Sequence, residues 1–150
     1  MERHQTLAAL SREHQENSHM KKDIESVKDI ELLIVRFYEK IKTDPLLGPI
    51  FTGVAKVNWG KHLQVVIGFW ENALFYTGTY SGNPMKTHKH LHHIFPLNEE
   101  HFKQWFFLFH STVDELFFGK NATLIKQKAL NIATIIQVKI LSEHSFGKSN

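Results

Sequence analysis

The sequence has 150 residues, a formal net charge of +3, 42% apolar residues and 22% charged residues, which is ordinary for one soluble domain with one core. It contains no cysteine, which excludes disulfides, thiolate zinc sites, iron–sulfur clusters and covalent attachment of haem through a C-x-x-C-H motif. No stretch approaches the roughly 18–20 apolar residues that span a bilayer. No run of Lys or Arg is long enough for a nucleic-acid arm. We therefore expect a cytoplasmic protein with neither a membrane nor a nucleic-acid partner.

The first part of the chain differs from the rest in composition. Residues 1–22 are polar and contain no Phe, Tyr or Trp. We expect this segment to be a disordered extension or a leader, and residues 23–150 to form a single folded domain.

Apolar residues recur at helical spacing from Asp29 onward. The first predicted helix buries one face and ends at Asp44-Pro45, because the residue before proline is disfavoured in the α region; that face comprises Ile30, Leu33, Ile34, Phe37, Tyr38 and Ile41. A short turn over residues 46–51, closed by Gly53, is expected next. A second helix then extends from Trp59 to near Gly78.

Two further helices are predicted after a histidine-dense stretch at residues 85–93. Asn98 is a candidate N-cap, and the acidic residues at 99 and 100 suit the positive end of a helix dipole. This helix runs toward Gly119, and Asn121 is expected to cap the last helix. No strand pattern and no repeat is found, so the predicted fold class is all-α.

Three hydrogen-bonding side chains lie on the apolar stripes of three different predicted helices, namely Tyr38, His62 and Trp105. A single residue of this kind is usually a core residue whose polar atoms are satisfied locally. Three such donors on three core faces indicate a cavity that contains an acceptor, because each buried donor left unsatisfied costs about 1–3 kcal/mol.

The stretch Thr87-His88-Lys89-His90-Leu91-His92-His93 is the other candidate for chemistry. His88 and His92 are four residues apart and could share a divalent metal on a helix. A solvated, weakly basic loop explains the same residues. The spacing alone does not select one imidazole as an iron ligand.

The order of several motifs resembles the third group of truncated haemoglobins. The matching pieces are Phe37-Tyr38-Glu39-Lys40, Leu47-Gly48-Pro49-Ile50-Phe51, Trp59-x-x-His62, Phe69-Trp70, Tyr80-x-Gly82-x-Pro84-x-x-x-His88 and Trp105. Each piece is weakly specific, but together they cover about residues 29–141 in the family order.

The resemblance implies a globin-like two-over-two helical sandwich with a short proximal helix, formed by residues 23–150. It implies that His88 is the proximal ligand of a noncovalent haem b, and that Tyr38, His62 and Trp105 line the distal side. The residues expected to pack around the haem are Phe37, Phe51, Trp59, Val66, Phe69 and Phe109. Lys86 and Lys89 are the expected contacts of the haem propionates.

The implied function is reversible binding of O2, CO or NO at a pentacoordinate iron. Three donors around the ligand would slow its release, which favours NO dioxygenase-like or peroxidase-like chemistry, or ligand sensing, over bulk transport. Sustained turnover would need a separate reductase. The alternative is a non-haem helical module that binds a divalent metal through its histidine-rich loop.

Overall fold

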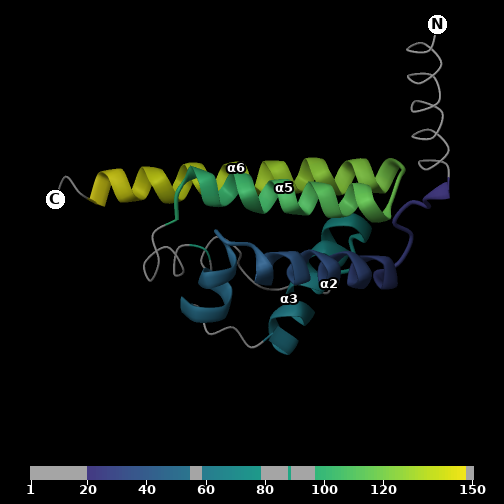
Figure 1. Ribbon diagram of the computed structural model, residues 1–150. Coiled ribbons are helices and arrows are strands. Elements are labelled where there is room, and N and C mark those ends of the chain that lie inside the picture. The colour runs from purple at the N-terminus through teal and green to yellow at the C-terminus, as the bar shows by residue number, and fades with distance from the viewer. Residues whose placement is uncertain (1–19, 55–58, 79–87, 89–96, 148–150) are drawn as a thin grey trace, which may run out of the picture.

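The computed structural model describes residues 20–54, 59–78, 88 and 97–147. These residues form helices and no strand, in the order α2 (Val27–Thr43), η1 (Ile50–Val54), α3 (Trp59–Phe75), α5 (Glu99–Leu116) and α6 (Lys120–Gly147). Helices α5 and α6 lie side by side in one layer, and α2 and α3 lie beneath them (Figure 1). Because α2 contacts both α3 and α5, and α3 contacts α6, two helices pack over two. The prediction of an all-helical two-over-two sandwich is confirmed.

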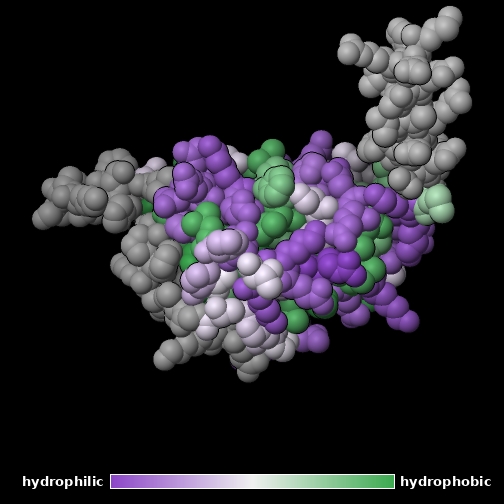
Figure 2. All heavy atoms as spheres, viewed as in Figure 1, coloured by the Kyte–Doolittle hydropathy of each residue, from purple (hydrophilic) through white to green (hydrophobic). Residues whose placement is uncertain are grey.

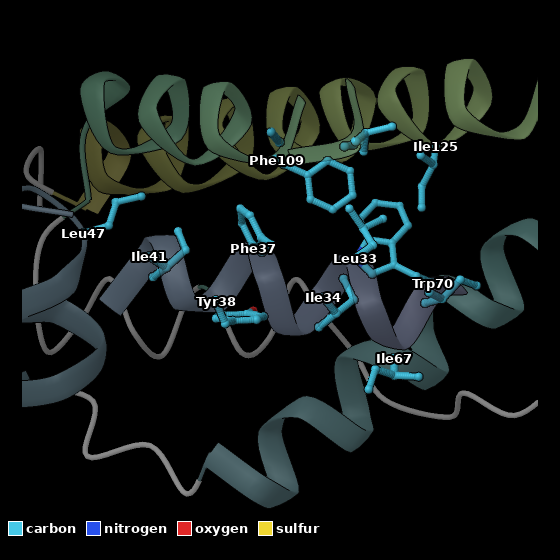
Figure 3. Packing of buried hydrophobic residues seen from close by; sticks show 14 of the residues in the cluster. Leu33, Ile34, Phe37, Tyr38, Ile41, Leu47, Ile67, Trp70, Phe109 and Ile125 are labelled. Atoms are coloured by element: carbon cyan, nitrogen blue, oxygen red, sulfur yellow. The ribbon is translucent and has the colours of Figure 1, made fainter. Parts of the chain in front are cut away.

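The core is built around α2, whose predicted apolar face is buried. Figure 3 shows Leu33 and Phe37 directed toward Phe109 of α5, while Ile67 and Trp70 approach α2 from α3. Phe109 is fully buried and stacks on the Trp70 ring with centroids 5.0 Å apart. Helix α2 therefore touches both layers, and its side chains reach the space on either side of it.

The short segment after α2 differs from the prediction of a turn closed by Gly53. Residues 48–49 are already helical and lead into the π-helix η1, which contains Gly53. The new helical turn starts where the amide of Gly48 donates to the carbonyl of Asp44 at 2.8 Å. The predicted closure was wrong because the glycine that the turn requires is Gly48. A Cβ at that position would lie 2.7 Å from a carbonyl oxygen of α2.

Helix α3 ends earlier than the sequence predicts, at Phe75 and not near Gly78. Tyr76 takes a left-handed conformation with φ of 54° and donates its amide to the carbonyl of Asn72 at 2.9 Å. The side chain of Asn72 then accepts the amide of Gly78 at 2.7 Å. The chain after α3 is therefore held to the last turn of this helix.

The predicted N-cap of α5 is confirmed. The side-chain oxygen of Asn98 accepts the amides of Glu100 and His101 at 3.0 and 3.3 Å. In return, Nδ1 of His101 accepts the amide of Asn98 at 2.9 Å, which completes a capping box with histidine in the place usually held by Glu or Gln.

The predicted cap of α6 was wrong. The two carboxylate oxygens of Asp23 accept the amides of Asn121 and Ala122 at 2.9 and 2.8 Å, so a residue far back in the chain satisfies the first amides of this helix. The side chain of Asn121 instead donates to the carbonyl of Ile24 at 2.7 Å. Gly119, with φ of 149°, makes room for this, because a Cβ there would lie 2.4 Å from Cγ of Asp23.

Charged side chains cover much of the surface, and Glu115 of α5 joins the two layers by pairing with Arg36 and Lys40 of α2 at 3.0 and 2.7 Å. Figure 2, in the same view as Figure 1, shows apolar groups among the hydrophilic ones on the surface. The exposed apolar side chains include Phe107 on α5 and Leu130 on α6. Among the described residues, no helix has both the length and the apolar character that crossing a membrane requires.

Candidate functional site

Two polar side chains from different helices meet below α2. Tyr38 is buried on α2 and His62 is half-buried on α3. Oη of Tyr38 and Nε2 of His62 lie 2.9 Å apart, which is hydrogen-bonding distance. Figure 3 shows that Tyr38 points away from the α5–α6 layer while its neighbour Phe37 points toward it. One helix thus supplies both a core residue and a site residue at adjacent positions, which diverge by about 100° around the helix axis.

Both members of this pair are held neutral. Burial raises the pKa of the Tyr38 phenol well above its usual range. Burial, and after it the nearby charge of His88, lowers the pKa of His62. In the tautomer with hydrogen on Nε2, His62 donates to the Tyr38 oxygen and leaves the phenolic hydrogen for another acceptor. In the other tautomer, the Tyr38 hydroxyl donates its hydrogen to Nε2 of His62, and no hydrogen is left for another acceptor.

His88, the expected iron ligand, is helical and half-buried. Its effect on the pKa of His62 means that the two imidazoles lie close enough to interact electrostatically. The structure therefore brings His88 to the same region as Tyr38 and His62. The other predicted residues of this stretch lie outside the described residues, namely Lys86, Lys89, His90, His92 and His93.

Aromatic rings surround the Tyr38–His62 pair. The Tyr38 ring packs edge-on against Phe51 of η1 and Trp59 of α3, with centroids 5.9 and 5.5 Å apart. Trp59 also packs edge-on against the imidazole of His62 at 6.0 Å. Phe51 and Trp59 are only partly buried, so apolar ring surface borders the two polar groups.

Sequence reasoning missed one cation beside these rings. Nζ of Lys42 lies 4.2 Å from the centroid of the Trp59 ring. Lys42 follows Tyr38 by four residues on α2, and residues four apart share a helix face, so this spacing could have drawn attention to it.

Trp105, the third predicted donor, belongs to a neighbouring group of rings. It is half-buried on α5 and packs edge-on against Phe37 at 5.8 Å. It also stacks on Phe109 at 5.5 Å, with ring planes 11° apart. Trp105 therefore adjoins the site through Phe37, the residue next to Tyr38.

The two remaining predicted packing residues follow His62 on α3. Val66 and Phe69 lie four and seven residues later, on the same helix face, and are partly buried against the core. The Phe69 ring packs edge-on against Trp70 with centroids 4.9 Å apart. This face of α3 therefore continues the apolar border that begins at Trp59.

Comparison with known proteins identifies the family to which this arrangement belongs. The sequence model of the bacterial-like globins matches residues 7–139.

The chain belongs to the bacterial-like globin family.

Within this family its relatives are truncated haemoglobins. The chain is 32% identical over 121 residues to the group 3 truncated hemoglobin of Campylobacter jejuni, and the match covers 79% of this chain and 93% of that protein. The crystal structure of a group III truncated hemoglobin from the same organism superimposes with a TM-score of 0.70 at 29% identity, covering 80% of this chain and 94% of that one. The resemblance to group III truncated haemoglobins is thus confirmed.

Globin family membership implies that the chain binds haem, and the described residues fit that group. A half-buried imidazole, His88, has the donor chemistry that haem iron accepts, and it lies near a second neutral imidazole, His62. The ring surfaces of Phe51, Trp59 and Phe69 suit the faces of a flat apolar macrocycle. Among the described residues, no group of three or more His, Asp or Glu side chains is placed to hold a bare metal ion.

Proposed function

We propose that this globin binds O2, CO or NO reversibly at a pentacoordinate haem b iron held by His88, with Tyr38, His62 and Trp105 lining the ligand side. Haem supplies an iron with one open position at which a diatomic molecule binds. Phe51, Trp59, Val66 and Phe69 pack around the macrocycle in this proposal, and the buried rings of Phe37 and Phe109 support them from the core. Lys86 and Lys89 contact its propionates.

The observation that carries the proposal is the 2.9 Å contact between Tyr38 and His62 inside a border of aromatic rings. A buried phenol with an imidazole partner presents one fixed donor to a ligand that carries partial negative charge. A neutral hydrogen bond contributes about 0.5–1.5 kcal/mol net, and one to a charged acceptor about 1.5–3 kcal/mol. Because 1.4 kcal/mol is tenfold in an equilibrium constant, this donor and the indole N–H of Trp105 together would slow O2 release by about two decades or more relative to an apolar pocket.

Firm retention of O2 fits chemistry or sensing better than bulk transport. We therefore propose that the protein consumes NO or peroxide, or senses a gas, and that a separate reductase in the cytoplasm supplies electrons for repeated turnover. The residues of the chain contribute by positioning: His62 fixes the hydroxyl of Tyr38, and the rings of Phe51 and Trp59 exclude water from this hydroxyl.

Absorption spectra of the ferric, ferrous and ferrous–CO forms test the assignment of His88. The purified protein should be red with a strong Soret band, and His88→Ala should lose most of its haem or show an altered ferrous spectrum. His110→Ala is the matched control, because His110 is a partly exposed histidine on α5 that pairs with Asp114 at 3.2 Å. If His88→Ala loads haem and binds CO as the unaltered protein does, the assignment is wrong. A colourless protein that binds zinc or nickel would instead support the non-haem module.

A further inference from the structure

A shallow groove lies at the turn between α5 and α6, away from the Tyr38–His62 pair. Its volume is about 550 Å³, and its lining residues are Phe118, Gly119, Lys120, Thr123, Leu124 and Gln127. Phe118 is 56% exposed and Leu124 is only partly buried. The described residues therefore leave a phenyl ring and part of a leucine side chain facing a hollow, which we call the corner groove.

The beginning of the described chain forms one rim of the corner groove. The amide of Phe118 donates to the carbonyl of Lys22 at 3.0 Å, and the Asp23 carboxylate lies against Gly119. Nζ of Lys21 donates to the carbonyl of Asp114 at 2.7 Å. Residues 1–19 therefore join the described structure beside this groove.

The sequence of that segment contains apolar residues that suit the corner groove. It contains Leu7-Ala8-Ala9-Leu10, and the two leucines are three residues apart, which places them on one face of a helix. The charges within residues 7–14 balance, because Arg12 accompanies Glu13, and Glu16 lies beyond these residues. The chain from Leu10 to Lys21 spans about 16 Å as a helix and about 36 Å when extended, so either form can bring Leu10 back to the rim.

The match to the globin family extends into this segment. The match begins at residue 7, so it contains Leu7 and Leu10 but not the first six residues.

We propose that residues 7–14 of the same chain dock in the corner groove, with Leu7 and Leu10 against Phe118 and Leu124. The segment covers the exposed phenyl ring and adds an apolar contact to the end of the α5–α6 pair at which Asp23 already caps α6. Docking there replaces the disordered extension or leader expected from composition.

Cysteine cross-linking in the full-length holoprotein tests the docking directly, because the chain has no cysteine of its own. The test pair is Leu10→Cys with Thr123→Cys, and the control pair is Leu10→Cys with Gln64→Cys, an exposed position on α3. Under mild oxidation the test pair should form an intramolecular disulfide at least tenfold faster than the control pair. Equal rates would overturn the proposal. Faster cross-linking between two chains than within one would also overturn it, by showing that a second copy occupies the groove.

Hydrogen–deuterium exchange provides a second readout that does not depend on how the haem is held. Amides of residues 7–14 should exchange at least tenfold more slowly than in a peptide of the same sequence. Leu124→Lys should remove this protection, and Leu130→Lys should retain it, because Leu130 is exposed on α6 and does not line the groove. Absence of protection in the unaltered protein, or equal loss in both variants, would contradict docking.

Discussion

The ammonium group of Lys42 lies 4.2 Å from the centre of the Trp59 ring, so the end of α2 and the start of α3 are joined by a cation–π contact beside the proposed gas-binding site. Trp59 in turn packs against both Tyr38 and His62. A surface charge thereby helps to fix a ring that borders the two polar groups.

We predict that Lys42 and Trp59 are energetically coupled. A double-mutant cycle of Lys42→Met and Trp59→Leu, measured as free energies of unfolding in urea, should give a coupling of about 0.5–1 kcal/mol. Methionine keeps the aliphatic stem and removes the charge. The same cycle with Lys28→Met, an exposed lysine in the first turn of α2, should give no coupling. Equal coupling in the two cycles would show that the contact has no net stabilising effect.

The proposed roles of the donors predict a graded effect on gas release. Tyr38→Phe keeps the ring packing but removes the hydroxyl, and stopped-flow measurement should show O2 dissociating about tenfold faster or more. Trp105→Phe should have a smaller effect, because Trp105 adjoins the site through Phe37. CO dissociation should change less than O2 dissociation in both variants, since CO carries little charge. Rapid O2 release from the unaltered protein, insensitive to both changes, would remove the basis for firm retention.

The carboxylate of Asp23 should contribute measurably to stability through α6. Asp23→Ala removes the acceptor of two helix amides and should lower the free energy of unfolding by about 1–2 kcal/mol. Gly119→Ala should also be destabilising, since its φ of 149° is unfavourable for alanine and its Cβ would meet Asp23. Glu31→Ala, at an exposed position on α2, serves as the control and should change stability by less than about 0.5 kcal/mol.

Acid should weaken the start of α5 through His101. Burial lowers the pKa of His101, and the charge of Glu100 opposes this only in part. The unfolded chain therefore takes up the proton first as the pH falls below about 6.5, and the stability due to neutral His101 is lost in that range. His101→Gln retains a side-chain acceptor that does not titrate. Urea unfolding at pH 7.5 and pH 5 should show a smaller acid-induced loss in this variant, and an equal loss would contradict the assignment.

Local sequence patterns were sufficient to predict the presence of the four long helices and the cap at Asn98. Helical spacing marks the buried face of α2, and an asparagine followed by two acidic residues marks the start of α5, because both signals lie within a few residues. The same kind of local signal gave a wrong prediction at Asn121, which does not cap α6. The groups that satisfy α6 come from Asp23, and a local pattern contains no information about a contact 98 residues away.

The candidate site could be predicted only in part from the sequence, again because some of its contacts join distant segments. Polar residues on apolar stripes singled out Tyr38 and His62, but only the crossing of α2 and α3 determines that their polar atoms meet. The choice of His88 among four neighbouring histidines came from family resemblance, and it stays a prediction. Lys42 was missed because its partner Trp59 lies on another helix, 17 residues later in the sequence.

Side-chain hydrogen bonds hold the chain both before and after the segment that carries His88. Asn72 holds the amide of Gly78 before it, and His101 holds the amide of Asn98 after it. The two ends of this segment are therefore fixed to α3, which carries His62, and to α5, which carries Trp105. The proposed iron ligand is thus connected at each end to a helix that carries a proposed ligand-side residue.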